Sequence, residues 1–371
     1  MLTWVEVDKE AIEFNLRQFR KLIGSDRLLM PVVKANAYGH GFLEVAKICD
    51  KSPQVDRMCV VNDDEAFTLT ENKIRKPVQI LTFYELDKTE KTLKLAKKGV
   101  IFPLFSLKQA IFLNKIGERA GKKIKVHIKV DTGASRVGLL PKEILPFLEK
   151  INKFSHLEIE GLFSHFAASE EDRIFTEHQM SSFEKIISDL EKRGYHIPIK
   201  HFACSSASVL YKKSLLNGVR LGLSLYGLYP DDLSKKIIKL QPALSWHTKI
   251  IQVRTLPAWT KIGYGGSFTT KRTTKIAVLP VGYWDGYDRG LSNKSFVLIG
   301  GKKCPIRGRI CMNICMADVS AVKNVKAGDG AVLIGRQKSN SISADNLADF
   351  AGTINYEIVD RINPLILRKI I

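Results

Sequence analysis

The sequence predicts an α/β protein with an amino-terminal (β/α)8 barrel of the TIM type and a second, mostly β carboxy-terminal domain. Three observations predict this fold class. Eight short apolar runs, each followed by a helix-like segment, fill about the first 220 residues, which is the repeat of a (β/α)8 barrel. After residue 240, strand-like runs and glycine turns replace that alternation. The length of 371 residues suits one large barrel and a smaller partner.

The apolar runs expected to form barrel strands are rich in Val, Ile, Leu and Phe, which favours buried parallel strands. They cover 27–35, 58–62, 78–82, 100–105, 124–131, 157–165, 197–204 and 218–226. Helical periodicity marks segments between them, at 41–50, 64–71, 107–120, 141–151 and 176–193. Asp63 and Asp64 precede one of these segments and Pro141 opens another, and both are signals for the start of a helix.

The second part of the chain carries the pattern of a β domain. Strand-like runs lie at 245–256, 275–281, 296–299, 304–310, 315–319 and 331–334, with segment 230–242 as the connector. We therefore expect the barrel to occupy residues 8–235 and the β domain to occupy residues 241–371. The strand at residues 1–7 is expected to join the second domain.

Composition excludes several classes of protein. No apolar run approaches the length of about 18 residues that a membrane helix needs, and from the acidic, alternating residues 1–8 we expect no secretory signal. Six cysteines form no repeated C-x-x-C pairs, so we expect reduced thiols and no metal, against a zinc alternative at Cys304, Cys311 and Cys315. The net charge of +20 is spread along the chain without a nucleic-acid motif, which indicates a solvated surface.

Polar side chains stand where several expected barrel strands end, and barrel enzymes carry their chemistry at that edge. They are Lys34, Asp131, Arg136, His165, Ser205, Ser206 and Arg220, and Gly222 follows Arg220 in the last run. Taken singly, each residue type has an ordinary structural role as a surface lysine, a hydrogen-bonded histidine or a salt-bridged arginine. Together they predict a site for a phosphorylated aldehyde cofactor and a carboxylate substrate.

Lys34 is the most informative of these residues. Four of the six residues before it are aliphatic, so we expect its side chain to leave the end of a buried apolar strand, where the amine is shielded from water. A desolvated amine is more easily neutral, and the neutral amine is the form that attacks a carbonyl. We therefore expect Lys34 to form a covalent bond with a carbonyl group.

Several motifs resemble those of one family. "VVKANAYGHG" (32–41) is similar to the pyridoxal-phosphate attachment segment of alanine racemases. Other segments resemble the family's motifs: "KVDTGASRVG" (129–138), "GLFSHFA" (161–167), "HFACSSA" (201–207), "VRLGLSLYG" (219–227), "GYGGSF" (263–268), "VGYWDGYDRG" (281–290), "GRICMN" (308–313) and "INYEI" (354–358). The resemblance covers nearly the whole chain and implies a head-to-tail homodimer. In such a dimer, each active site takes residues from the partner's carboxy-terminal domain.

The resemblance implies interconversion of L-alanine and D-alanine on a pyridoxal 5'-phosphate aldimine. Lys34 would hold the cofactor as a Schiff base and act as one base, and Tyr264 of the other subunit would be the second base on the opposite face. A tyrosine side chain is a weak base at neutral pH. Nearby positive charge must therefore lower the pKa of this tyrosine. The resemblance links it to His165 and Arg220, and it implies that Arg220 also faces the cofactor's pyridine nitrogen.

Other roles come from the same resemblance. Arg136 and the backbone at Met312 would bind the substrate carboxylate, and Tyr283 matches a position on the substrate side. Lys129 matches a position that is often carbamylated. The implied cofactor-binding residues are Lys34, Tyr38, Ser205, Arg220, Gly222, Leu223 and Tyr356.

The sequence departs from the family pattern at three places. Cys204 replaces an asparagine near the phosphate, which changes the donors available to the cofactor. Asn313 replaces an aspartate near the substrate entrance, which changes the charge there. The carboxy-terminal residues 361–371 lack the arginine-tyrosine ending of the family.

The implied function is that of a cytoplasmic alanine racemase supplying D-alanine for peptidoglycan, with no nucleic-acid or membrane partner. The alternatives are a racemase of another amino acid such as serine, a barrel-type amino-acid decarboxylase, and a non-enzymatic pyridoxal-phosphate carrier. Arg136 argues against the decarboxylase, because a carboxylate held by an arginine is not poised to leave. Tyr264 and the residues after it argue against the carrier, which lacks a β domain.

Overall fold

The computed structural model describes residues 2–371, and the chain forms two compact units. The barrel unit contains residues 11–34 and 45–241. The β unit contains residues 2–10, 35–44 and 242–371. Residues 35–44 thus group with the β unit although they lie inside the range 8–235 expected for the barrel, and the expected domain boundaries stay a prediction. None of the helices in residues 2–371 is long and apolar enough to cross a bilayer.

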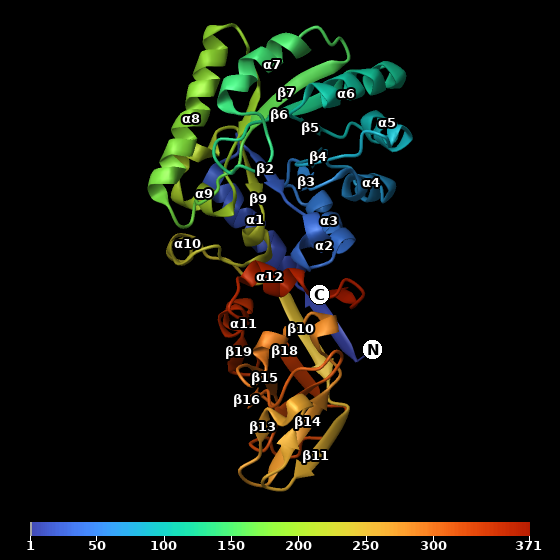
Figure 1. The fold of residues 1–371 in the computed structure, drawn as a ribbon, viewed down its shortest axis with the longest axis vertical. Coiled ribbons are helices and arrows are strands. Elements are labelled where there is room, and N and C mark those ends of the chain that lie inside the picture. Colours follow the sequence, from blue (N-terminus) through green and yellow to red (C-terminus); the bar gives the residue numbers. More distant parts are fainter. Residues whose placement is uncertain (1) are drawn as a thin grey trace. The chain divides into compact units, whose positions relative to one another are not determined.

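Eight parallel strands form the barrel, as the sequence predicts (Figure 1). They are β2 (Leu28–Pro31), β3 (Met58–Val60), β4 (Val78–Ile80), β5 (Phe102–Leu104), β6 (Ile124–Lys129), β7 (Leu157–Phe163), β8 (Ile199–His201) and β9 (Gly218–Leu221). Six of them pair in the order β2-β9-β8-β7-β6-β5, and β3 pairs with β4. Parallel bridges Val32–Cys59 and Gln79–Ile101 connect the two groups and close the ring.

Helices follow the barrel strands and cover them on the outside (Figure 1). They are α1 (Lys9–Ile23), α3 (Phe42–Lys51), α4 (Asp63–Glu71), α5 (Thr89–Lys97), α6 (Leu107–Ala120), α7 (Ile144–Ile151), α8 (Arg173–Lys192), α9 (Ser205–Leu210) and α10 (Asp232–Ile237). Side chains cap several amino termini: Asn62 accepts from the Glu65 N–H, Ser106 from Gln109 and Asp172 from Phe175. These caps satisfy backbone donors that would otherwise lack partners.

The β unit is built on a seven-stranded sheet with the path β16-β15-β18-β10-β1-β20, and β19 pairs with β18. Its strands are β1 (Thr3–Val7), β10 (Leu244–Lys249), β15 (Phe296–Ile299), β16 (Lys302–Pro305), β18 (Gly330–Gln337), β19 (Asn340–Ile342) and β20 (Arg368–Ile370). Smaller sheets contain β11 (Gln252–Leu256), β14 (Thr274–Leu279) and β17 (Cys315–Asp318), and β12 (Lys261–Ile262) with β13 (Phe268–Thr269). The first strand of the chain thus pairs antiparallel with β10 and parallel with β20.

Among the helices that the sequence analysis does not mark, three lie in the connector and the β unit. The connector contains α10, which begins because Asp231 accepts a hydrogen bond from the Ser234 N–H at 2.7 Å. The β unit also carries α11 (Ala344–Ala351) and α12 (Asn355–Asp360). Ser343 caps α11, and both helices are too short to show a clear helical period in the sequence.

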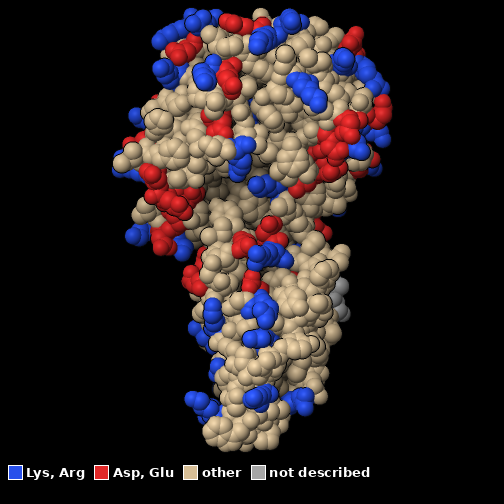
Figure 2. Space-filling view, in the orientation of Figure 1, with Lys and Arg blue, Asp and Glu red and all other residues tan. Residues whose placement is uncertain are grey.

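Charge is distributed rather than gathered. On the face shown in Figure 2, basic and acidic side chains are interspersed over the barrel unit, without one continuous basic patch. Over the β unit of the same face basic side chains outnumber acidic ones, and the interpretation of the +20 net charge as a solvated surface stays a prediction.

Candidate active site

Lys34 directly follows the buried end of a barrel strand. Strand β2 ends at Pro31, and the next two residues, Val32 and Val33, are buried. The Val33 N–H donates to the Cys59 carbonyl at 2.9 Å, so the backbone remains hydrogen-bonded to the neighbouring strand up to the residue before Lys34. Lys34 itself is half-buried. Its amine therefore emerges at the carboxyl end of the barrel, the edge where barrel enzymes place their active sites.

The backbone after Lys34 adopts a strained conformation. Ala35, Asn36, Ala37 and Tyr38 all have φ near +52°. Each left-handed residue that is not glycine costs about 1–2 kcal/mol. Tertiary contacts hold this turn, because the Arg368 guanidinium donates to the Gly39 carbonyl at 2.9 Å and 3.1 Å. Strain of this kind persists where surrounding structure enforces it, and it clusters at functional sites.

Four basic side chains gather around His165. The pKa of His165 lies well below its ordinary value because of burial and the positive charges of Arg220, Lys129, Arg136 and Lys34. The imidazole is therefore neutral near pH 7. The structure thus brings together Lys34, Arg136, His165 and Arg220, four of the residues that the sequence analysis places on the barrel rim, and adds Lys129 to them.

Lys129 lies at the end of β6 and is 6% exposed. Burial, followed by the charges of Arg220 and Arg136, lowers the pKa of Lys129 to about 7. Its Nζ atom lies 4.4 Å from the centre of the Phe163 ring. The neutral form of this amine is therefore accessible near neutral pH, and a neutral amine is the form that reacts with carbon dioxide.

Arg136 is positioned by the loop after β6. The Asp131 carboxylate accepts hydrogen bonds from the N–H groups of Gly133 at 2.9 Å, Ser135 at 3.0 Å and Arg136 at 2.8 Å. Burial raises the pKa of Asp131, but these donors outweigh burial and hold that pKa below its usual value. Lys129, Asp131, Arg136 and His165 line one small cavity of about 10 Å³.

Arg220, on β9, is 3% exposed and donates in several directions. Its Nη2 atom bonds the Ser164 carbonyl at 2.6 Å and lies 3.3 Å from His165 Nδ1. Its Nη1 atom bonds His201 Nδ1. Because a guanidinium has no acceptor, His165 Nδ1 must accept, and the proton of the neutral His165 imidazole is on Nε2.

A group of hydroxyl and N–H donors surrounds the start of α9. Ser205 Oγ accepts from the N–H groups of Gly222 at 3.1 Å and Ser224 at 3.3 Å. Ser206 Oγ is buried and has no partner among residues 2–371. Leu223 begins the short 3-10 helix Leu223–Tyr226 that follows Gly222. An unpartnered buried hydroxyl beside a helix amino terminus fits an anionic phosphate group.

Cys204 immediately precedes α9. Its Sγ atom lies 3.5 Å from Ser169 Oγ. Burial raises the pKa of this thiol, so it is neutral near pH 7. Cys204 thus offers only a weak hydrogen-bond donor at this position.

In the β unit, a groove of about 770 Å³ contains Tyr264 and Met312. Tyr264 is 73% exposed and Met312 is 55% exposed, which is high for large side chains beside a cavity. Asn313 also lines this groove. Tyr283 is close to the same segment, because its N–H donates to the Cys311 carbonyl at 3.1 Å.

Tyr38 and Tyr356 form a second pair in the β unit. Their ring centres are 6.1 Å apart, and Tyr356 lies on α12. The two phenols come from positions more than 300 residues apart in the sequence. The pairing places the strained turn after Lys34 beside α12.

Sequence analysis missed a set of buried polar side chains inside the barrel. They are Gln79, His127, Glu160 and His201, all of which are at most 7% exposed. They occupy inward-facing positions of strands β4, β6, β7 and β8. A polar residue inside an otherwise apolar strand run was the available signal, since buried polar groups are uncommon and need partners.

The fold and these side chains define a class of protein: an enzyme with a closed eight-stranded barrel and a β domain, carrying a lysine-centred cationic site. Two models of known protein families match this chain. The description "Alanine racemase, N-terminal domain" matches residues 7–230, and "Alanine racemase, C-terminal domain" matches residues 243–370. The chain belongs to the alanine racemase family, whose curated members are isomerases, and it is an enzyme of that class.

Relatives and solved structures agree with this assignment. The alanine racemase of Methanococcus maripaludis is 42% identical over 359 residues, which is 96% of this chain and 95% of the relative. The alanine racemase of Halothermothrix orenii is 41% identical over 373 residues, which is 99% of this chain and 96% of the relative. The structure of the Clostridium difficile 630 alanine racemase superposes with a TM-score of 0.93 at 33% identity, covering 100% and 96%. The structure of the Bacillus anthracis alanine racemase with bound L-Ala-P superposes with a TM-score of 0.90 at 33% sequence identity, and the match covers 100% of this chain and 95% of that one.

Proposed function

We propose that this protein interconverts L-alanine and D-alanine with pyridoxal 5'-phosphate, using Lys34 and Tyr264 as the two bases. One observation carries the proposal: the Lys34 amine stands at the end of a buried strand, within a set of basic side chains that keeps His165 neutral. When bound, pyridoxal phosphate supplies an aldehyde for an amine and a ring that withdraws electrons from the α-carbon.

Residues of the barrel fit this cofactor. Lys34 would hold the aldehyde carbon. The donors around Ser205, Ser206 and Gly222, with the backbone of Leu223, would receive the phosphate. Arg220 would face the pyridine nitrogen and donate to it. Since a guanidinium does not give up its proton near neutral pH, the ring would remain a weaker electron sink than one paired with a carboxylic acid.

The β unit would supply the cofactor's remaining contacts. Tyr38 and Tyr356, whose rings are paired, would lie near the phosphate. Cys204 offers a weaker donor than an amide. We therefore expect phosphate binding to depend more strongly on these two phenols and on the serines.

Substrate binding would use charge and backbone. Arg136 would hold the carboxylate of alanine, because a guanidinium forms two parallel hydrogen bonds with a carboxylate. The backbone at Met312 and the side chain of Tyr283 would lie on the substrate side. Lys129, converted to its carbamate, would place a negative charge beside Arg136 and orient it.

Proton transfer would occur on both faces of the α-carbon. The Lys34 amine would remove or return the proton on one face. The Tyr264 phenolate would do so on the other, supplied by a second copy of the chain in a head-to-tail homodimer. The exposure of Tyr264 in an open groove supports this sharing. The neutral His165 can donate from Nε2 to a phenolate and thereby stabilise it.

The decarboxylase alternative is weaker, because a carboxylate bound by Arg136 is stabilised against departure. The carrier alternative does not use the groove around Tyr264. As for its setting, we propose the cytoplasm, with D-alanine supplied to peptidoglycan synthesis.

Incubation of the purified protein with pyridoxal phosphate and L-alanine in deuterated water tests the reaction. We expect deuterium at the α-carbon together with loss of optical activity. Release of carbon dioxide would instead indicate a decarboxylase. Exchange of the α-proton with complete retention of configuration would show that the second base is absent, and would contradict the two-base proposal.

A further inference from the structure

A continuous file of polar side chains crosses the interior of the barrel from Glu160 to Arg220. Glu160 Oε2 lies 2.8 Å from His127 Nε2, and His127 Nδ1 lies 2.8 Å from His201 Nε2. His201 Nδ1 is in turn bonded to Arg220 Nη1. Both imidazoles are fully buried, and Arg220 is 3% exposed. The file therefore joins the interior of the barrel directly to a residue of the candidate active site.

The two ends of the file determine where its protons lie. Arg220 can only donate, so His201 Nδ1 must accept. Burial and the charge of Arg220 keep the pKa of His201 well below its ordinary value, so its single proton is on Nε2 and points to His127 Nδ1. Burial likewise lowers the pKa of His127 to about 4, so this imidazole is neutral near pH 7. Because its Nδ1 accepts from His201 Nε2, its single proton is on Nε2 and faces Glu160.

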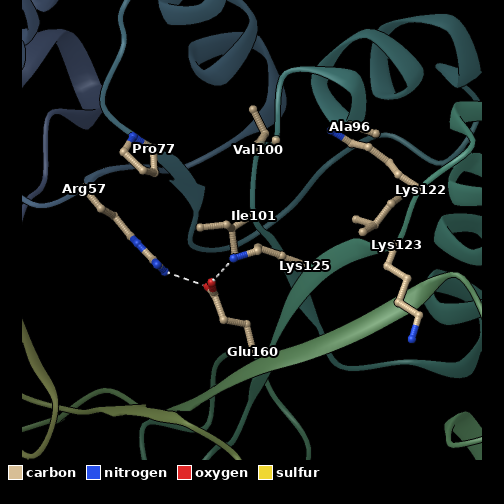
Figure 3. A pocket seen from close by; sticks show the side chains of 11 residues that line it. Arg57, Pro77, Ala96, Val100, Ile101, Lys122, Lys123, Lys125 and Glu160 are labelled. Carbon is tan, nitrogen blue, oxygen red and sulfur yellow. Dashed lines mark hydrogen bonds and ion pairs between the residues drawn. The ribbon is translucent and has the colours of Figure 1, made fainter.

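The Glu160 end is a fixed carboxylate. Arg57 Nη1 donates to Glu160 Oε2 at 3.0 Å, and Lys125 Nζ donates to Oε1 at 2.7 Å (Figure 3). Burial raises the pKa of Glu160, but the hydrogen bonds from His127 and Lys125 and the charge of Arg57 outweigh burial and hold the pKa far below its usual value. An ionised carboxylate only accepts. Every link of the file therefore donates in one direction, from Arg220 to Glu160.

Arg220 needs such a connection because it lacks a carboxylate of its own. Apart from the two histidine nitrogens, its hydrogen bonds go to the carbonyl groups of Ser164, His201 and Phe202. Within residues 2–371 it forms no salt bridge with Asp or Glu. A buried cation without a countercharge is costly, and polarised hydrogen-bond chains strengthen interactions in a low-dielectric interior.

We propose that Glu160 is a positioning residue for Arg220, acting through His127 and His201 to fix the direction of the guanidinium and to supply its countercharge. The effect on catalysis rests on the proposed function, in which Arg220 faces the cofactor's pyridine nitrogen. The direction of the hydrogen bonds does not rest on it. Arg57 and Lys125 keep Glu160 ionised. Arg57 Nη1 also lies 3.3 Å from His127 Nε2, but that nitrogen is nearer to Glu160 Oε2, at 2.8 Å, and we assign its hydrogen bond to the carboxylate.

The positions of the protons can be read by 15N NMR on full-length protein labelled at its eight histidines. The His127→Gln and His201→Gln variants would assign the two signals. We expect both side chains to be neutral with the proton on Nε2 at pH 6 to 8. A proton on Nδ1 of either residue, or an imidazolium at either position, would overturn the proposal. This measurement needs neither cofactor nor activity.

The consequence for Arg220 is tested by Glu160→Gln in the cofactor-loaded enzyme. The amide oxygen can still accept from His127, but the charge is lost. We expect kcat to fall about tenfold, because hydrogen bonds to charged groups are the stronger ones, while KM for alanine, which reflects Arg136, stays within twofold. Glu158→Gln is the matched control, because this residue lies two positions earlier on the same strand and is exposed. We expect no change in kcat there.

A double variant covers failure of Glu160→Gln to fold. Arg57→Met with Glu160→Leu removes the buried ion pair together, which is tolerated better than removal of one partner. His127 Nε2 then loses its acceptor, so we expect its two tautomers to mix and kcat to fall as in Glu160→Gln. A single retained tautomer with kcat equal to that of Glu158→Gln would refute the proposal. A wild-type protein without racemase activity would contradict the proposed function alone, and the histidine spectra would still decide the direction of the file.

Discussion

Lys129 provides the sharpest test of the electrostatics of the barrel rim. It is 6% exposed, and burial with the nearby charges of Arg220 and Arg136 lowers its pKa from 10.5 to about 7. Lys129→Met keeps an unbranched apolar chain of similar length but removes the amine. The variant should therefore remove the cost of a buried charge while keeping the contact with Phe163.

The sign and size of the effect follow from proton binding. In the unfolded chain the lysine stays protonated up to pH of about 10, whereas in the folded protein it loses its proton near pH 7. The unfolded state therefore binds one more proton in this window, and the free energy of unfolding rises with pH by about 1.4 kcal/mol per pH unit. From pH 7 to 9 the contribution is about 2 kcal/mol, because the slope is only half developed at pH 7 itself. Stability from this source is lost as the pH falls toward 7 and stays lost below it.

Urea unfolding in carbonate-free buffer at pH 6, 7, 8 and 9 measures this difference. Far-UV circular dichroism is the suitable signal, because all four tryptophans lie outside the barrel unit. We expect the wild type to gain about 2 kcal/mol between pH 7 and 9 relative to Lys129→Met. Lys123→Met, an exposed lysine just before the same strand, is the control and should match the wild type. An identical pH dependence in wild type and Lys129→Met would refute the reasoning.

Bicarbonate extends the same test to carbamylation. The neutral Lys129 amine would form an N–C bond with carbon dioxide and release a proton, which leaves a carboxylate beside Arg136 and Arg220. We therefore expect added bicarbonate to stabilise the wild type at pH 7 to 8 and to leave Lys129→Met unchanged. A 13C carbamate signal present in the wild type and absent from the variant would confirm the chemistry.

Three further predictions concern the site and its support. Lys34→Ala should abolish both the visible absorption band of bound cofactor and racemisation, and a variant that keeps either would contradict the role of this amine. Tyr264→Phe should keep the absorption band but lose racemisation, most strongly from L-alanine; near-normal rates in both directions would exclude it as the second base. Gly39→Ala should destabilise the folded protein by about 3 kcal/mol or more in urea unfolding, because an added Cβ would lie 1.8 Å from the Val359 carbonyl oxygen at φ +79°. Gly24→Ala has the same φ without a neighbour within 4 Å, so it should cost only about 1 kcal/mol, and equal costs would show that the clash is relieved.

The strained turn after Lys34 illustrates how tertiary contacts override local preference. Ala35, Asn36, Ala37 and Tyr38 favour right-handed conformations by themselves. Their left-handed backbone depends on Gly39 packing against the Val359 carbonyl and on Arg368, which is over 300 residues away. The motif around Lys34 identifies a reactive lysine, but it does not contain the forces that shape the turn.

The sequence by itself determined the eight barrel strands, the lysine at the end of the first and the β character of residues after 240. These features depend on periodicity and composition, which are local properties of the chain. The helices α10, α11 and α12 escaped prediction because they are short and are fixed by single caps and packing. Lys129 looked like any other lysine in the sequence; its low pKa comes from burial beside two arginines distant in the chain. The file from Glu160 to Arg220 likewise joins four residues, one on each of the strands β6, β7, β8 and β9. The partners at its first two links are 33 and 74 residues apart in the sequence. Only closure of the barrel decides that these side chains meet, because no local pattern encodes which inward-facing residues of different strands share one layer.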